Sequence, residues 1–114
     1  MALLTRDAIL QADDKKTAEV AIKEWGGDVR IRSLSAGEKG RFEQKMLNKN
    51  LDYSTVHAEY IAMICVDENG KNLFSAADVK ALSDKSASAL QRIFEEGNKL
   101  NSFDEDDLKE LAKN

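Results

Sequence analysis

The sequence predicts a mainly helical α+β domain, with one N-terminal β-hairpin packed on four to five short helices. Two short runs of alternating apolar residues flank Gly26-Gly27, which is the pattern of a hairpin. After the hairpin, repeated capping signals precede segments with apolar residues at helical spacing. The 114 residues contain no proline, which fits short helices joined by tight loops. The length predicts one domain over 1–114, with an acidic helix or tail at 102–114.

The hairpin is predicted over roughly 17–33, with a loop of two residues. That loop length brings the apolar residues to one face of the sheet: Val20, Ile22, Val29 and Ile31. It pairs Ile22 with Ile31 and leaves Lys23 opposite Arg30, which is mildly unfavourable for two like charges.

Capping residues predict one helix before the hairpin and one helix after it. Thr5 is a cap for a short helix from Arg6 to about Ala12. Ser35 to Glu38 form a capping box for a helix that runs to about 48. Two residues of this second helix, Phe42 and Met46, lie one turn apart and are expected to face the core.

The segment from about Tyr53 to Val66 is predicted to be the central helix. Apolar residues cover most of its circumference, which is typical of a helix buried on nearly all sides. A turn is expected at 67–70, followed by a short extended piece and a capping signal at 75–78 that opens a short helix. The next helix starts at Ser83 or Ser86 and reaches about Leu100.

Composition narrows the classes of function. The net charge of −4 disfavours a domain that binds nucleic acid over its whole surface. Cys65 is the only cysteine, so no internal disulfide is expected and a reducing compartment is favoured. The N-terminus lacks the pattern of a signal peptide, and no apolar run is long enough for a membrane span. We therefore expect a cytoplasmic protein that binds no nucleic acid and no membrane.

Residues that carry catalytic or metal chemistry are sparse. His57 and Cys65 are eight positions apart on one predicted helix, a rise of about 12 Å that prevents them from sharing a proton. Two such residues cannot close a metal site. The run from Asp67 to Lys71 begins like a calcium loop, but its later positions do not supply the required ligands. The sequence therefore predicts no enzyme, no metal and no cofactor.

The candidate partner contacts in the hairpin are Trp25, Arg30 and Arg32. Trp25 at the tip either anchors a partner or folds back over the core. The two arginines either dock an acidic partner or form a solvated face that is neutralised by Glu19 and Asp28. Both alternatives stay open for each side chain.

The other candidate contacts lie in the acidic C-terminal run. Phe103, Leu108 and Leu111 give this run a thin apolar edge. The edge either docks a partner or packs a terminal helix, whose N-terminal end is favoured by four acidic residues at 104–107.

Several short motifs follow one another in a characteristic order along the chain. The N-terminal motifs are Val20-x-Ile22, Trp25-Gly-Gly, Val29-Arg-Ile-Arg-x-Leu34-Ser, Glu38 and Arg41-Phe42-Glu43. The later motifs are Cys65-Val-Asp-Glu-Asn-Gly, Leu73-Phe74-Ser75, Asp78, Leu82-Ser83, Leu100-Asn101 and the acidic tail. This order resembles the tail assembly chaperones of lambdoid long-tailed bacteriophages. The resemblance covers roughly 17–114 and is carried by serial order rather than by any one motif. One departure is Lys23-Glu24, where such proteins often carry proline before the tryptophan.

The resemblance implies a non-enzymatic protein made late in infection, in the cytoplasm of the host bacterium. It implies binding to the tape measure protein, recruitment of tail tube protein subunits, and absence from the mature virion. It also implies a longer form made by a −1 frameshift as a further partner, and Ala112-Lys113-Asn114 can be encoded by a slippery heptamer. The oligomeric state stays open between a monomer and a homo-oligomer.

Two other functions remain as alternatives. One is a small structural or adaptor protein of the phage tail. The other is a small nucleic-acid-binding regulator that uses the face carrying Lys23, Arg30 and Arg32, against which the acidic balance of the chain argues.

Overall fold

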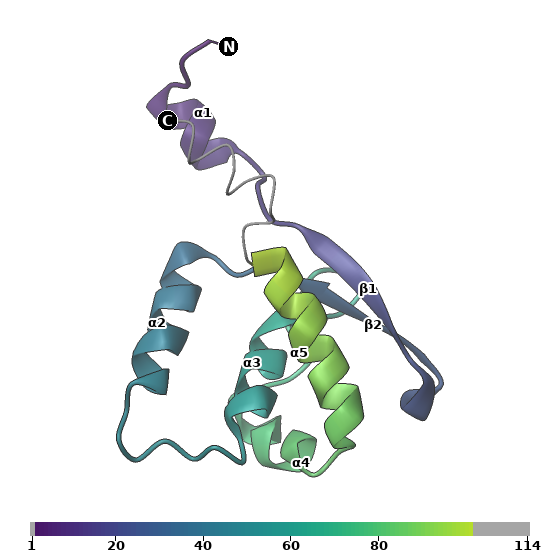
Figure 1. Cartoon of the computed structure of the whole chain (residues 1–114). Coiled ribbons are helices and arrows are strands. Elements are labelled where there is room, and N and C mark those ends of the chain that lie inside the picture. The colour runs from purple at the N-terminus through teal and green to yellow at the C-terminus, as the bar shows by residue number, and fades with distance from the viewer. Residues whose placement is uncertain (1, 102–114) are drawn as a thin grey trace.

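A computed structural model describes residues 2–101 and confirms the mainly helical α+β class. Three antiparallel strands form one sheet in the order β1-β2-β3, and the helices lie around it (Figure 1). The strands are β1 (Thr17–Ile22), β2 (Gly27–Arg32) and β3 (Cys65–Val66). The helices are α1 (Arg6–Gln11), α2 (Ala36–Met46), α3 (Val56–Ile64), α4 (Val79–Ser83) and α5 (Ala87–Asn101), with 3-10 turns η1 (Lys23–Trp25) and η2 (Ala76–Asp78).

The hairpin has the predicted faces but not the predicted register. Val20 pairs with Val29, and Ile22 pairs with Gly27 instead of Ile31. The connection is longer than two residues because η1 forms a 3-10 turn and Gly26 adopts φ 72°, with its N–H donating to the Ile22 carbonyl at 3.0 Å. The register shift is an even number of residues, so every side chain keeps its face.

The new register also corrects the predicted clash of like charges. Arg30 lies opposite Glu19 rather than Lys23, and the two side chains form an ion pair at 2.9 Å. The same guanidinium donates to the Glu68 carbonyl oxygen at 3.3 Å. A favourable cross-strand pair therefore stands where the sequence predicted a repulsive one.

The central helix is shorter at both ends than predicted. Tyr53 lies in the preceding loop with 82% of its surface exposed, and α3 begins at Val56. At the other end, Cys65 and Val66 leave the helix and pair with Ile31 and Arg30 of β2. A continuous apolar run is compatible with a buried helix or a buried strand, so its periodicity alone could not place this boundary.

The core lies between the sheet and the helices α3 and α5, which pack side by side (Figure 1). Its largest fully buried side chains are Ile22, Ile31, Ile61, Ile64, Ile93 and Cys65. Tyr60 of α3 contacts Phe42 and Phe94, at ring-centroid distances of 5.3 and 5.1 Å. Burial raises the pKa of the Cys65 thiol to about 12, so this cysteine is protonated at neutral pH.

The remaining capping predictions are confirmed by local hydrogen bonds. The Thr5 hydroxyl accepts from the Ala8 N–H at 3.1 Å at the start of α1. The turn at 67–70 closes with Gly70 at φ +80° and its N–H on the Asp67 carbonyl at 3.0 Å. The Ser86 carbonyl accepts from the Leu90 N–H at 3.1 Å, which places the start of α5 at the second of its two predicted positions.

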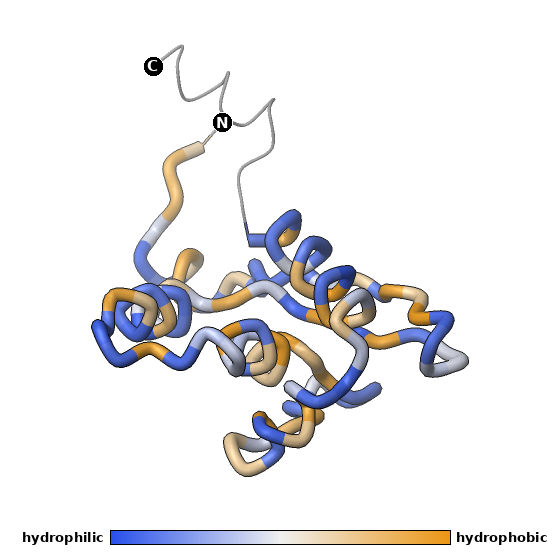
Figure 2. Tube along the Cα trace, turned by 60° about the horizontal axis from the view of Figure 1, so that its bottom comes forward, coloured by the Kyte–Doolittle hydropathy of each residue, from blue (hydrophilic) through white to orange (hydrophobic). Residues whose placement is uncertain are grey.

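Helices α1 and α2 lie at the periphery. Figure 1 shows α1 extending away from the body and α2 set apart from the other helices. Met46, predicted to face the core, has 39% of its surface exposed, whereas Phe42 is partly buried as expected. The chain before α1 is apolar (Figure 2). Four large apolar side chains before and within α1 are exposed to solvent: Leu3, Leu4, Ile9 and Leu10.

Candidate binding groove

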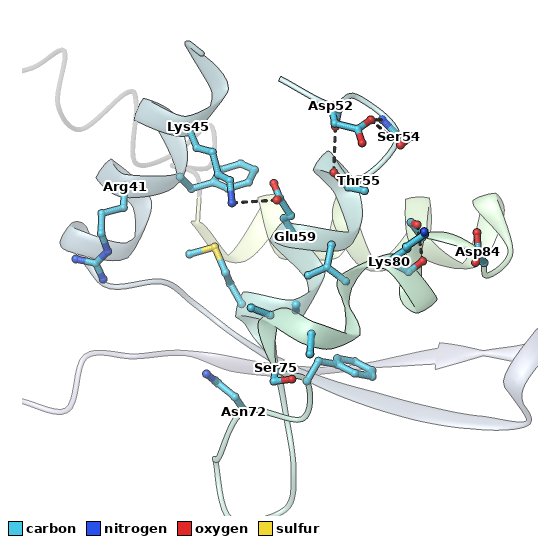
Figure 3. Close-up of a pocket in the computed structure, with 18 residues that line it drawn as sticks. Arg41, Lys45, Asp52, Ser54, Thr55, Glu59, Asn72, Ser75, Lys80 and Asp84 are labelled. Carbon is cyan, nitrogen blue, oxygen red and sulfur yellow. Dashed lines mark hydrogen bonds and ion pairs between the residues drawn. The ribbon is translucent and has the colours of Figure 1, made fainter. Parts of the chain in front are cut away.

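An open groove of about 960 Å³ lies between α2, α3 and the segment that leads into α4. Its walls come from α2, the loop that follows it, α3, and the segment from Asn72 to the end of α4 (Figure 3). This volume is in the range of sites that bind sizeable ligands. It is the larger of the two hollows that we describe within residues 2–101.

The floor of the groove is apolar and its rim carries charges of both signs. The apolar residues that line it are Phe42, Ala62, Met63, Phe74, Ala76, Ala77 and Val79. The charged residues are Arg41, Lys45, Lys80, Asp52, Glu59 and Asp84. Three exposed apolar side chains, Met46, Leu47 and Tyr53, lie at the end of α2 and in the loop beyond it. An apolar floor with a mixed charged rim suits an amphipathic segment.

One ion pair bridges the groove. Lys45 of α2 contacts Glu59 of α3 at 2.9 Å, and Figure 3 shows the two side chains reaching toward one another. The Lys45 side chain is 56% exposed, and ion pairs this open to solvent are weak. The bridge therefore holds α2 only loosely against α3 at this end.

The loop from α2 to α3 is shaped by Asp52. Its carboxylate accepts from the Ser54 hydroxyl at 2.6 Å and from the Ser54 N–H at 3.0 Å. These hydrogen bonds lower the pKa of Asp52. The Asp52 carbonyl also accepts from the Thr55 N–H at 3.1 Å, which leads the chain into α3. The wall of the groove is thus a turn with its own hydrogen bonds.

The other end of α2 is anchored firmly. Ser35 and Glu38 form the predicted capping box, with the Glu38 N–H donating to the Ser35 hydroxyl at 3.2 Å. The Glu38 carboxylate also accepts hydrogen bonds from the two terminal guanidinium nitrogens of Arg32, Nη1 and Nη2, at 2.8 and 2.7 Å. Because this fork joins β2 to α2, the N-terminal end of α2 is fixed while its C-terminal end borders the groove.

We expect the pairing of Arg32 with Glu38 to make stability depend on acidic pH. The Arg32 guanidinium lowers the pKa of Glu38 from its ordinary 4.5 to about 2 in the folded state. Because the folded pKa is the lower one, the contribution is complete above about pH 4.5 and is lost as the pH falls toward 2. Chemical denaturation between pH 7 and pH 2 should show a loss of stability in this window that is smaller in Glu38→Gln. An equal loss in both proteins would contradict this prediction.

The hairpin candidates do not line the groove. Trp25 is 38% exposed at the hairpin tip, while Arg30 is paired with Glu19 and Arg32 with Glu38. Arg30 is neutralised by Glu19, as one of the two predicted alternatives has it, whereas Arg32 pairs with Glu38 rather than Asp28 and its side chain is only 14% exposed. Phe103, Leu108 and Leu111 lie outside the described residues. A binding role for each of these six residues stays a prediction.

The residues of the groove come from segments far apart in the sequence, which is why sequence reasoning missed the site. One local signal exists: α2 has only Phe42 and Met46 as large apolar residues over 36–46. A helix with so narrow an apolar stripe cannot pack closely along its length. The small number of apolar residues in α2 is the sequence signal that could have indicated that this helix lies apart from the body.

Comparison with solved structures relates this arrangement to one protein of known role. The structure of the bacteriophage HK97 tail assembly chaperone superposes on the chain with a TM-score of 0.62, over 86% of this chain and 95% of that one, at 18% sequence identity. The chain has the fold of a tail assembly chaperone. No protein-family model matches the chain, and no curated protein matches its sequence.

The tail assembly chaperone fold therefore persists here at low sequence identity. The resemblance seen in the serial order of motifs is confirmed at the level of the fold. Among the helices within residues 2–101, none combines the length and the apolar character that crossing a membrane requires.

Proposed function

We propose that this chain is a phage tail assembly chaperone, a non-enzymatic protein that binds the tape measure protein and keeps it soluble. The observation that carries the proposal is the shared fold, which covers most of both chains. In this proposal the protein works in the host cytoplasm, helps to recruit tail tube subunits, and is absent from the finished virion. A frameshifted longer form of the same chain is its further partner.

The groove is the proposed contact surface for the client. Tape measure proteins are long and mostly helical, so their exposed segments are amphipathic helices that need apolar cover. The groove offers an apolar floor that includes Phe42, Met63 and Phe74, and its rim carries both lysines and carboxylates. Such a surface covers the apolar stripe of a helix and pairs with flanking charges of either sign. Trp25 and the apolar edge of Phe103, Leu108 and Leu111 are proposed as additional contacts.

A charge placed on the groove floor should prevent binding. Ala76 and Ala77 line the groove and are themselves exposed, so Ala76→Glu/Ala77→Glu adds two carboxylates without disturbing buried packing. Leaving these charges unpaired against an apolar helix should weaken binding at least about tenfold, equivalent to about 1.4 kcal/mol. The measurement is the soluble fraction of a co-expressed tape measure fragment, followed by pull-down of the complex.

The matched control is Ala87→Glu, an exposed alanine of α5 that does not line the groove. It should retain the fragment as the unmodified chain does. If the unmodified chain fails to keep any tape measure fragment soluble, the proposed function is wrong. If it succeeds and the groove variant succeeds equally, the function stands and the groove is the wrong surface. Leu108→Ser/Leu111→Ser in the same assay measures the contribution of the C-terminal edge.

A further inference from the structure

The two edges of the sheet differ in how their backbone groups are covered. At the β3 edge, the chain folds back so that Asn72 forms a bridge with Val66 and the Leu73 N–H donates to the Cys65 carbonyl at 2.9 Å. At the opposite edge, β1 runs for six residues, 17–22. Within residues 2–101, no segment pairs with the outer side of β1. The sheet thus has one covered edge and one open edge.

The hydrogen-bond parity identifies which residues of β1 face outward. The Ser33 N–H donates to the Lys16 carbonyl at 2.8 Å, so Lys16 belongs to the residues that bond to β2. Along an antiparallel strand, successive residues direct their backbone N–H and C=O groups alternately toward one neighbouring strand and away from it. The even-numbered residues of β1 therefore bond to β2, while the backbone groups of Thr17, Glu19 and Ala21 point away from β2. An open row of this kind is a template for another strand.

We propose that two copies of this chain pair antiparallel through their β1 edges. The proposal goes beyond the function above and does not depend on it. The side-chain pattern of β1 is self-complementary about Val20: a two-fold axis there places Val20 opposite Val20, and Ala18 opposite Ile22 of the second copy. The core-facing residues then continue across the junction, because Val20 and Ile22 are buried and Ala18 is partly buried.

The same axis keeps the negative charges of the two Glu19 side chains from facing each other. Glu19 is the only charged residue in β1, and it lies opposite Ala21 of the second copy rather than opposite another Glu19. Both of these positions are outward-facing, so they form the hydrogen-bonded pairs of the new ladder. A shift of two residues in one direction would put Glu19 against Glu19, and in the other direction it would put Glu19 opposite position 23, which lies in η1 beyond the end of β1. A shift of one residue would mix the two faces. One register is therefore favoured.

Apart from the charge of Glu19, β1 lacks the features that usually protect an edge strand. Natural edges are blunted by proline, lysine, bulges or covering segments. The six residues of β1 contain no proline or lysine and pair regularly with β2 without a bulge. Antiparallel pairing also brings the exposed N-terminal segment of one copy, which includes Ile9 and Leu10, past the hairpin tip of the other copy, where Trp25 is exposed.

Because one short strand buries little surface area, we expect a weak dimer whose population depends on the protein concentration.

The test is sedimentation velocity of the full chain over a wide range of concentration, with two substitutions at Ala21. Ala21→Pro removes an outward N–H and leaves the bonds to β2 intact, as proline allows in an edge strand. The matched Ala21→Thr retains the N–H and favours a strand. The unmodified chain and Ala21→Thr should dimerise, and Ala21→Pro should associate at least about tenfold more weakly because each dimer loses two hydrogen bonds. A monomer at all concentrations, or a dimer of undiminished strength in Ala21→Pro, would overturn the proposal.

Amide exchange and cross-linking test the edge without relying on the proline variant to fold. The Glu19 and Ala21 amides of the unmodified chain should become protected from exchange as the concentration rises. Protection that is independent of concentration would show that the chain covers its own edge, and would overturn the proposal. Glu19→Cys/Ala21→Cys should form disulfide-linked dimers under oxidation, while Glu19→Cys alone should not. Equal cross-linking of the single variant would overturn the favoured register.

Discussion

Replacing Gly97 with alanine should lower the free energy of unfolding by about 1 to 2 kcal/mol. A Cβ atom at this position of α5 would lie 2.6 Å from Ile64 Cδ1 and 2.9 Å from Tyr60 Cε1 of α3. Neither neighbour has room to move, because Ile64 is fully buried and the Tyr60 ring packs against Phe42 and Phe94. The overpacking therefore outweighs the gain of about 1 kcal/mol that alanine gives over glycine inside a helix. Urea denaturation measures the difference.

Gly40 provides the matched control for the same substitution. It lies inside α2, and a Cβ atom there would meet no other atom within 4 Å. Gly40→Ala should therefore raise the free energy of unfolding by about 0.5 to 1 kcal/mol, because only the helix propensity changes. The two variants should shift stability in opposite directions. Stabilisation by both would mean that α3 and α5 do not pack as closely as described.

The hairpin shows what the sequence could predict and where it stopped. Alternation assigned Val20, Ile22, Val29 and Ile31 to one buried face, and that assignment is confirmed. The register was wrong because the face pattern is unchanged by any even shift. The deciding feature was the turn, where Lys23 to Trp25 wind into a 3-10 turn and Gly26 takes the left-handed conformation. Two adjacent glycines do not reveal which residue will adopt that conformation.

The groove could not be predicted from the sequence, for a different reason from the one that made the hairpin register wrong. Local signals placed the start of α2 at Ser35 and the start of a short helix after Ser75. Both capping boxes form, although the second one opens the 3-10 turn η2, and α4 itself begins at Val79. The distance between helices depends instead on a few long-range contacts, such as Lys45 with Glu59 and Phe42 with Tyr60. None of these contacts follows from periodicity or capping. The elements were therefore predictable, while the hollow between them was not.

The fixed part of the molecule contacts α2 through Tyr60, which does not itself line the open groove. Its ring contacts Phe94 of α5 on one side and Phe42 of α2 on the other. A smaller hollow of about 180 Å³ lies on the other side of α2, with Phe42, Tyr60 and Asn101 among its lining residues. Phe42 is thus the apolar contact of α2 with the core between two hollows. This arrangement explains how α2 remains in place while leaving apolar surface accessible.

Replacing Asn101 with alanine should lower the free energy of unfolding by about 2 kcal/mol. The Asn101 amide makes three hydrogen bonds, two of which join the end of α5 to other parts of the chain. Its oxygen accepts from the Leu34 N–H at 2.7 Å, and its nitrogen donates to the Tyr60 hydroxyl at 3.0 Å and to the Gly97 carbonyl at 2.9 Å. Alanine leaves the part-buried Leu34 N–H and the buried Tyr60 hydroxyl without this partner, and such losses cost more than the bonds themselves contribute.

A double-mutant cycle with Tyr60→Phe separates these contributions. Tyr60→Phe removes the hydroxyl and keeps the ring contacts with Phe42 and Phe94, so it isolates the bond to Asn101. If the bond forms, the double variant Asn101→Ala/Tyr60→Phe should be less destabilised than the sum of the two single variants, with a coupling energy of about 0.5 to 1.5 kcal/mol. Simple additivity would contradict the bond. The hydrogen bond from the Leu34 N–H to Asn101 remains intact in Tyr60→Phe, and this bond joins the end of α5 to the segment that leads into α2. Tyr60→Phe should therefore lower the free energy of unfolding by less than Asn101→Ala does.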